Sequence, residues 1–209
     1  MLISRRGLIG AGAATTLVPA VQSAEALKPT PSEDIGPFYP IVTVLESQCD
    51  LTRVPGQSAR AVGTPFELIM TVKTPTGAPV RSAMVMIWQA SAAGVYGHPR
   101  DYVKKAADPG FLGHALMRTG RDGSVRIVSI RPGAYPDDDT RLRTPHLHFE
   151  VIGESSRLIT QMYFPGEPLN AKDRLIENMT KAGKDPRSLL ADQRTAPESF
   201  AWTAVLPTR

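Results

Sequence analysis

Cysteine is almost missing from this chain of 209 residues, in which Cys49 is the only one. A single cysteine forms no disulfide within the chain and cannot supply a zinc or iron–sulfur site that is built on several thiolates. A basic stripe is missing too, because the formal net charge is only +4 and the lysines and arginines are scattered among acidic residues. A nucleic-acid partner is therefore not expected.

Long hydrophobic runs are also missing, and no stretch of the sequence reaches the length that crosses a bilayer. The N-terminus nevertheless has a recognisable order: Arg5 and Arg6, then a Gly- and Ala-rich apolar stretch, then small residues at 23–26. This order is typical of a twin-arginine export signal, and the alternative is a short amphipathic or disordered N-terminus. We expect residues 1–26 to be a signal peptide and the protein to be periplasmic or extracellular.

Proline and glycine divide the rest of the chain. Residues 27–63 are rich in proline and contain the sequence GPFYP at 36–40, which predicts an extended arm instead of a helix. Short apolar or alternating runs, separated by turn signals, follow from residue 64 and predict strands at 66–73, 80–89, 115–119, 125–130, 146–152, 157–164 and 200–206. Helical spacing at 170–183 predicts one short C-terminal helix. We therefore predict an all-β fold, an antiparallel β-sandwich over residues 64–209.

Two of the four histidines, His146 and His148, are separated by one residue in a predicted strand. Residues at i and i+2 of a strand point to the same face, so both rings can reach one metal ion. For an isolated His-x-His pair, two exposed surface histidines are the commoner outcome. Here two tyrosines accompany the pair, Tyr135 between Ala134 and Pro136 and Tyr96 further upstream, whereas no role is assigned to the other two histidines.

Three motifs in this order resemble those of the intradiol ring-cleavage dioxygenases: WQASAAGVY at 88–96, PGAYP at 132–136 and RTPHLHF at 143–149. The similarity also includes GPFY at 36–39 and TQMYF at 160–164, and the protocatechuate-cleaving members fit best. The resemblance implies one non-haem Fe(III) ion per chain. It also implies that a catechol and O2 are the substrates, and that the ring opens between its two hydroxylated carbons to a cis,cis-muconate-type diacid.

The resemblance further implies roles for individual residues. It makes Tyr96, Tyr135, His146 and His148 the metal ligands, with Tyr135 also taking a substrate proton when it leaves the metal. It makes Arg143 and Gln161 groups that stabilise developing charge, and it places Gly36, Pro37 and Trp88 around the substrate. The alternatives for these residues are a surface charge at Arg143, a ladder or turn residue at Gln161 and a core aromatic at Trp88.

The chemistry of the four implied ligands agrees with iron(III). Two phenolates and two neutral imidazoles form a hard, electron-rich set, whereas an Fe(II) oxygenase typically uses two histidines and one carboxylate. A free tyrosine has a pKa of about 10, so binding as phenolate near neutral pH needs a strongly acidic metal ion. The ligand set therefore favours the oxidised ion.

Departures from the family pattern leave the substrate and the assembly open. The loop between Tyr135 and His146 is short and lacks a tryptophan after the Tyr-Pro pair. Protocatechuate, catechol, hydroxyquinol and a bulkier diol therefore remain alternatives. Because one chain has both the arm and all four ligands, we expect a monomer or a homo-oligomer. The competing functions are a non-catalytic binding module with a structural zinc site and an exported copper redox protein.

Overall fold

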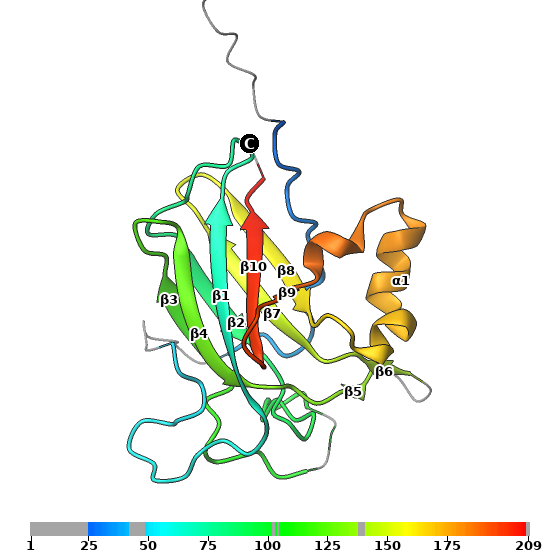
Figure 1. Cartoon of the computed structure of the whole chain (residues 1–209). Coiled ribbons are helices and arrows are strands. Elements are labelled where there is room, and N and C mark those ends of the chain that lie inside the picture. Colours follow the sequence, from blue (N-terminus) through cyan, green and yellow to red (C-terminus); the bar gives the residue numbers. More distant parts are fainter. Residues whose placement is uncertain (1–24, 42–48, 102, 104, 138–140, 208–209) are drawn as a thin grey trace, which may run out of the picture.

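The structure, a computed structural model, describes residues 25–41, 49–101, 103, 105–137 and 141–207. Two four-stranded sheets pack face to face around one large hydrophobic core (Figure 1). The predicted β-sandwich is therefore confirmed. Nearly all of the predicted signal segment, residues 1–24, lies outside the described residues.

The first sheet has the order β4-β1-β10-β9. Its strands are β4 (Ser124–Ile130), β1 (Pro65–Lys73), β10 (Ser199–Val205) and the short β9 (Asp192–Gln193). β1 pairs with β4 in the antiparallel sense but with β10 in the parallel sense. The sequence pattern did not predict this parallel pair, which is possible because most of the domain lies between β1 and β10 and provides the crossover.

The second sheet is antiparallel throughout and has the order β3-β2-β7-β8. Its strands are β3 (His114–Arg118), β2 (Met84–Trp88), β7 (His146–Ile152) and β8 (Arg157–Tyr163). The predicted bounds of β7 agree with the structure. Strand β2 begins four residues later than predicted, because a tight turn at residues 81–82 precedes it and Ser82 has a positive φ of 54°.

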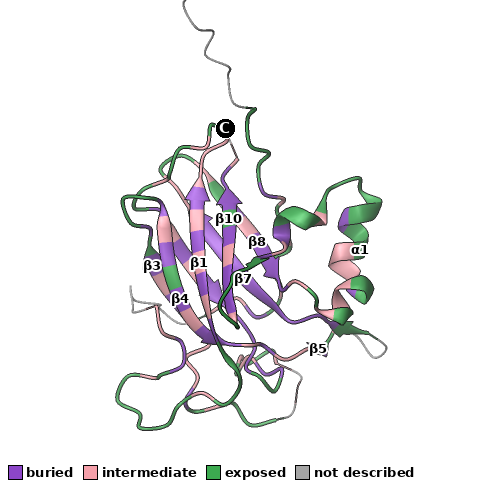
Figure 2. Ribbon diagram, in the orientation of Figure 1, coloured by how far each residue is buried: buried purple, intermediate pink, exposed green. Residues whose placement is uncertain are grey.

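Strand β7 is buried on both faces, as Figure 2 shows. Leu147, Phe149 and Val151 point into the sandwich core, where each is fully buried. His146 and His148 lie on the opposite face and are nevertheless almost inaccessible to solvent. A second layer of chain must therefore cover the outer face of this sheet.

Residues 27–41, the first part of the arm predicted at 27–63 and called the arm below, provide part of this layer. The arm has no regular secondary structure, and it is fixed by backbone bonds from Thr30 N to Val205 O (2.9 Å) and from Glu33 N to Ile159 O (2.9 Å). Further along the arm, the Tyr39 hydroxyl donates to Glu150 (2.7 Å) on β7. The arm therefore crosses from the end of β10 to the outer face of β7.

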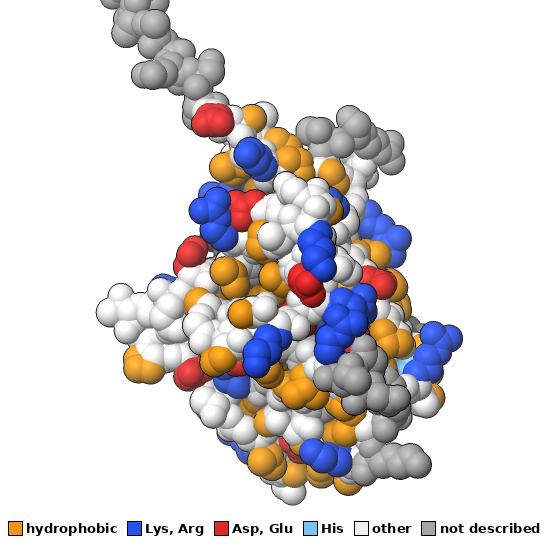
Figure 3. Space-filling view, turned by 90° about the vertical axis from the view of Figure 1, so that its right-hand side faces the viewer, with side chains coloured by type: hydrophobic (Ala, Val, Ile, Leu, Met, Phe, Trp, Pro, Cys, Tyr) orange, Lys and Arg blue, Asp and Glu red, His pale blue; other side chains and the backbone are white. Residues whose placement is uncertain are grey.

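The predicted C-terminal helix is divided into short pieces. The α-helix α1 (Arg174–Lys181) lies to one side of the sandwich between two 3-10 helices, η1 (Pro168–Lys172) and η2 (Pro186–Leu189). α1 begins after Asp173, whose carboxylate accepts the backbone N–H groups of Leu175 and Ile176. Among the described residues, no helix is long and apolar enough to cross a membrane. Figure 3 views the molecule from the right-hand side of Figure 1. Positively and negatively charged side chains are interspersed on this face.

Candidate active site

The two histidines of β7 and Tyr135 form the centre of a buried cluster. The Nε2 atoms of His146 and His148 lie 3.0 Å apart, and the Tyr135 hydroxyl lies 3.2 Å from Nε2 of His146. Tyr135 begins β5 (Tyr135–Pro136), which pairs with β6 (Leu142–Arg143) in a small ribbon directly before β7. Three polar rings that are distant from solvent therefore converge on one point.

Tyr96 completes the cluster from the loop that follows β2. Its ring centroid lies 5.2 Å from that of Tyr135 and 6.1 Å from that of His148. The backbone N–H of Tyr96 donates to Asp101 (2.6 Å), which fixes the loop, whereas its buried hydroxyl has no hydrogen-bond partner of good geometry among the described residues. A buried polar atom without a partner is energetically costly. The Tyr96 hydroxyl is therefore suited to bind a metal ion.

The environment fixes the protonation states of these groups. Burial lowers the pKa of both His146 and His148 well below the usual range, with a smaller effect from the Arg143 charge. Burial, together with the neighbouring Tyr135, raises the pKa of Tyr96 well above its usual value. Both imidazoles are therefore neutral, the form that binds metals, whereas Tyr96 becomes a phenolate only beside a strong Lewis acid.

The residues present fit a ferric ion. His146 Nδ1 lies 2.6 Å from the carbonyl oxygen of Thr144, which favours a proton on Nδ1 and leaves the lone pair of Nε2 directed at the cluster. In the described part of the chain, this cluster included, no three histidine, cysteine, aspartate or glutamate side chains come together to hold a metal ion, so the two tyrosines are needed to complete a donor set here. A metal at this cluster would have two imidazole nitrogens and two phenol oxygens as donors.

Arg143 and Gln161 lie together beside the cluster. Arg143, which is 5% exposed, donates from Nη2 to Gln161 Oε1 (2.6 Å) and from Nε to Asp173 Oδ2 (2.8 Å). The alternative that Arg143 is a surface charge is therefore wrong. Burial alone lowers the pKa of Arg143, but Tyr135 and Asp173 outweigh it and raise the pKa, so the guanidinium stays charged.

Gln161 and Trp88 both lie opposite His148 in the sheet, on the two strands that flank β7. The Trp88 indole stacks on the His148 ring with centroids 4.9 Å apart and an interplanar angle of 9°. Trp88 is only 1% exposed, and none of the residues that the structure describes accepts a hydrogen bond from its Nε1. Trp88 is thus a buried aromatic residue, which agrees with the alternative that it is a core aromatic. It also packs against one side of the cluster.

The arm approaches the cluster at Gly36 and Pro37. Gly36 has a φ of +72°, and a Cβ atom there would lie 3.3 Å from Cε1 of His148, so a larger residue would press on that ring. Immediately after Pro37, Phe38 stacks on Tyr96 with centroids 4.5 Å apart and packs edge-on against Tyr135 at 5.8 Å. The arm therefore covers both the tyrosines and the histidines.

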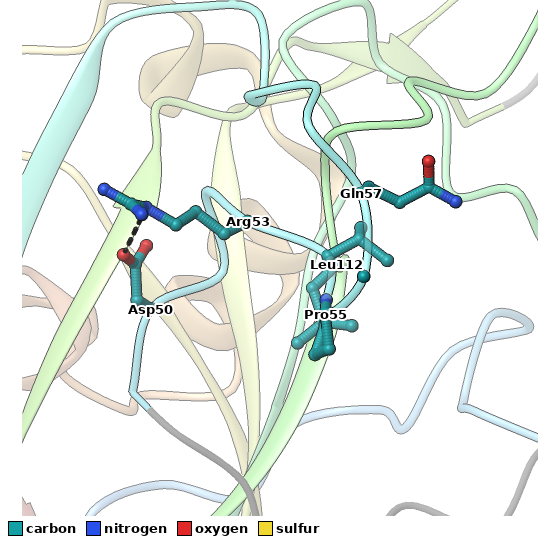
Figure 4. Close-up of a pocket in the computed structure, with 7 residues that line it drawn as sticks. Asp50, Arg53, Pro55, Gln57 and Leu112 are labelled. Carbon is teal, nitrogen blue, oxygen red and sulfur yellow. Dashed lines mark ion pairs between the residues drawn. The ribbon is translucent and has the colours of Figure 1, made fainter.

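A cavity of about 430 Å³ lies beside the cluster, and Phe38, Trp88 and Tyr96 are among its lining residues. A larger cavity of about 510 Å³ lies at the loop that carries Asp50 and Arg53, as Figure 4 shows. None of the clustered tyrosines and histidines lines that larger cavity. The smaller, aromatic cavity is therefore the candidate substrate site.

Sequence reasoning missed two residues that support this site. Glu150, on the same face of β7 as the histidines, accepts from Tyr39 and from Arg157 (2.6 Å) and so fastens the arm. Burial and the bond to Glu150 raise the pKa of Tyr39 to about 12, so its hydroxyl remains a donor. The other residue is Asp173, the partner of Arg143. Polar residues at every second position of β7 could have indicated that Glu150 lies on the face of the histidines. An aspartate directly before a helical run could have indicated that Asp173 caps the helix.

Gly94 provides a test of how tightly the Tyr96 loop packs. It has a φ of +76°, and a Cβ atom there would overlap the carbonyl oxygen of Ala134, next to Tyr135. Gly77, with a φ of +84°, has open space around it and is the matched control. We expect Gly77→Ala to lower the free energy of unfolding by about 1 kcal/mol, the cost of the left-handed backbone. Gly94→Ala should lower it by about 1–3 kcal/mol more, from overpacking. Urea denaturation measures the unfolding free energy of both variants. Equal losses would contradict the close packing of the Tyr96 loop against the segment that contains Ala134 and Tyr135.

The chain matches known proteins over most of its length. The family model described as Dioxygenase matches residues 35–201. The protocatechuate 3,4-dioxygenase beta chain of Burkholderia cepacia is 37% identical over 158 residues, which cover 74% of this chain and 63% of that protein. Catechol 1,2-dioxygenase 1 of Acinetobacter lwoffii is 30% identical over 155 residues, 67% of this chain and 48% of that protein. This chain thus spans less than two thirds of the length of either relative.

Solved structures agree with this match. The dioxygenase domain of a dioxygenase–carbohydrate-binding protein fusion from Streptomyces sp. SirexAA-E superimposes with a TM-score of 0.64 and 28% identity, covering 87% of this chain and 100% of that one. An intradiol ring-cleavage dioxygenase from Tetranychus urticae has the same fold, with a TM-score of 0.66 at 17% identity over 86% of this chain and 94% of that one. The chain belongs to the intradiol ring-cleavage dioxygenase family.

Proposed function

We propose that this protein is a non-haem iron(III) intradiol dioxygenase that cleaves a catechol between its two hydroxylated carbons. One catechol and one O2 combine, and both oxygen atoms enter the product, a cis,cis-muconate-type diacid. The observation that carries the proposal is the buried convergence of Tyr96, Tyr135, His146 and His148, four side chains that can bind a metal ion around one point. When bound there, the ferric ion would draw electron density from a chelated catechol and so prepare its ring for O2.

Tyr135 is the proposed internal base. Its hydroxyl contacts His146 Nε2 at 3.2 Å, and its ring packs edge-on against Phe38 of the arm. As a phenolate, its oxygen would accept a proton from one hydroxyl of the incoming catechol, which is general base catalysis by a positioned side chain. Tyr96, whose hydroxyl has no hydrogen-bond partner of good geometry in the described part of the chain, would remain a fixed ligand together with the two histidines.

Arg143 is the proposed electrostatic stabiliser. Its guanidinium is buried and permanently charged, and Coulomb interactions strengthen in such a water-poor environment. Negative charge that develops on the substrate ring would therefore be stabilised without reorganisation of solvent. Gln161 accepts a hydrogen bond from Arg143 and donates one to the backbone of Asp34. It would therefore hold the guanidinium and the arm in fixed positions relative to each other.

The lining of the 430 Å³ cavity supports a single aromatic ring as substrate. Phe38, Trp88 and Phe111 contribute aromatic faces, and Pro40 and Ile41 extend the apolar surface along the arm. Such surfaces favour a planar, largely apolar ligand with a few polar groups. Gly36, Pro37 and Trp88 are the proposed substrate-binding residues, and the particular catechol is left to the assay.

The visible spectrum of the iron-loaded protein tests the proposal, first alone and then with catechol or protocatechuate without O2. A broad tyrosinate-to-iron band that moves to longer wavelength on addition of substrate is expected. Admission of ¹⁸O-labelled O2 should then give a ring-opened diacid that contains both labelled atoms. A protein that stays colourless after loading with iron would instead favour the binding module with a structural metal.

Two further parts of the proposal concern the whole protein. We propose that residues 1–26 direct export by the twin-arginine route, which a cleaved N-terminus in periplasmic or secreted material would demonstrate. We also propose that a single kind of chain suffices for activity, as a monomer or homo-oligomer, since the arm and the proposed ligands belong to the same chain. The mass of the active species measures this directly.

A further inference from the structure

Asp173 is a completely buried carboxylate that none of the proposed chemical roles uses. It is 0% exposed and lies at the junction of η1 and α1, outside both sheets. Both of its oxygens are fully engaged: Oδ1 accepts the N–H groups of Leu175 and Ile176, and Oδ2 accepts from Arg143 and from the backbone of Thr144. A helix cap alone would need only the first oxygen.

The second oxygen of Asp173 connects the helix to the cluster by two routes. One route is the ion pair with Arg143 at 2.8 Å, in which both side chains are almost fully buried. The other is the bond from Thr144 N at 3.0 Å, because the carbonyl oxygen of the same Thr144 holds Nδ1 of His146 at 2.6 Å. The Thr144 hydroxyl also donates to Asn170 Oδ1 (2.8 Å) in η1, so this short segment is fixed at two points.

We propose that Asp173 is a positioning residue: its carboxylate aims the Arg143 guanidinium at the site and, through Thr144, sets the orientation of the His146 ring. This inference rests on the proposed function for its effect on turnover, but the placement of His146 can be measured without iron. Groups that hold metal-bound histidines and charged side chains in place typically change activity or metal affinity by about 10–100-fold when they are replaced.

The test uses Asp173→Asn, which is similar in size and keeps an oxygen that can cap α1, but removes the charge opposite Arg143. Asp173→Ser is the second variant, because serine also caps helices but is too short to reach Arg143 and cap α1 together. The control is Asp185→Asn. Asp185 caps η2 and pairs with an arginine, Arg187, in the same way, but it is exposed and distant in sequence from the cluster residues. Only variants with a cooperative unfolding transition are compared.

Two readouts are expected to change together in the Asp173 variants. Neither readout should change in the Asp185→Asn control. In the iron-loaded protein, kcat should fall about 10–100-fold with KM nearly unchanged, since the substrate cavity is intact. In the iron-free protein labelled with ¹⁵N-histidine, the Nδ1 proton of His146 should lose its protection from exchange. A folded Asp173 variant with wild-type kcat and an unchanged His146 signal would overturn the proposal.

The two readouts also separate this proposal from the proposed function. A wild-type protein that neither binds iron nor turns over a catechol would refute the function, whereas the His146 signal would still report whether Asp173 places the ring. An unchanged signal in the Asp173 variants refutes the route through Thr144 in either case.

Discussion

Tyr96→Phe is expected to abolish the tyrosinate-to-iron spectrum of Tyr96 and to lower turnover by more than about 100-fold, while the iron-free protein keeps or slightly gains stability. The loss follows from the removal of a proposed ligand, since outer partners alone are worth about 10–100-fold. The stability is retained because the Tyr96 hydroxyl is buried and has no hydrogen-bond partner of good geometry among the described residues, so its removal relieves a cost. Iron content, the visible spectrum, kcat and urea denaturation measure these effects.

Tyr163→Phe is the matched control for this prediction. The Tyr163 hydroxyl is buried near the same histidines but donates to Glu33 (2.9 Å) and Gln161 (3.2 Å). Its removal should therefore cost about 1 kcal/mol of unfolding free energy and leave the iron band in place. Should Tyr96→Phe keep the wild-type tyrosinate-to-iron spectrum, or destabilise the protein as much as Tyr163→Phe does, Tyr96 is a structural residue and not a ligand.

Arg143→Ala is expected to lower kcat by about 100–1,000-fold, the usual effect of removing a pre-oriented stabilising group, and to weaken iron binding much less. The same change leaves the buried Asp173 carboxylate without its cation and should cost about 3–5 kcal/mol of unfolding free energy. Arg143→Lys separates the two effects. It retains the charge but cannot donate to Gln161 and Asp173 in the same fork, so it should keep most of the stability and lose part of the rate.

The control for Arg143 is Arg157→Ala. Arg157 pairs with Glu150 at the other end of β7, and its side chain is largely exposed. Its loss should leave kcat almost unchanged, because an exposed partner contributes little. Equal losses of iron binding and of kcat in Arg143→Ala would remove the electrostatic role from Arg143 and make it a residue that maintains the ligand geometry.

The sequence predicted most of the sandwich because apolar alternation is a local signal. Strand β7 had the predicted bounds, β1, β4 and β8 differed from prediction by one residue at one end, and β10 differed by one residue at each end. The parallel pairing of β1 with β10 could not be predicted in this way, because alternation determines which face a residue occupies and not which strand lies beside it. The C-terminal helix was predicted as a single piece and is divided at Asp173, where a tertiary contact fixes the boundary.

The site shows the same division between local and long-range information. The motif at residues 143–149 identified both histidines, and the spacing alone placed them on one face of a strand. That this face is buried depends on the arm, more than 100 positions away, whose Tyr39 reaches Glu150. The partner of Arg143 likewise lies 30 positions further along the chain, in a segment that reads from sequence simply as the start of a helix.

The burial of β7 on both faces also has a kinetic consequence. The strand that carries His146 and His148 is paired on each side and fills the core with its other face, so the histidines cannot move apart by opening of a surface loop. Segments of this kind exchange their amide protons only when the whole domain opens. The two histidines would then keep their spacing for as long as the sandwich stays folded, and the exchange of the amide protons of β7 would measure the unfolding of the domain.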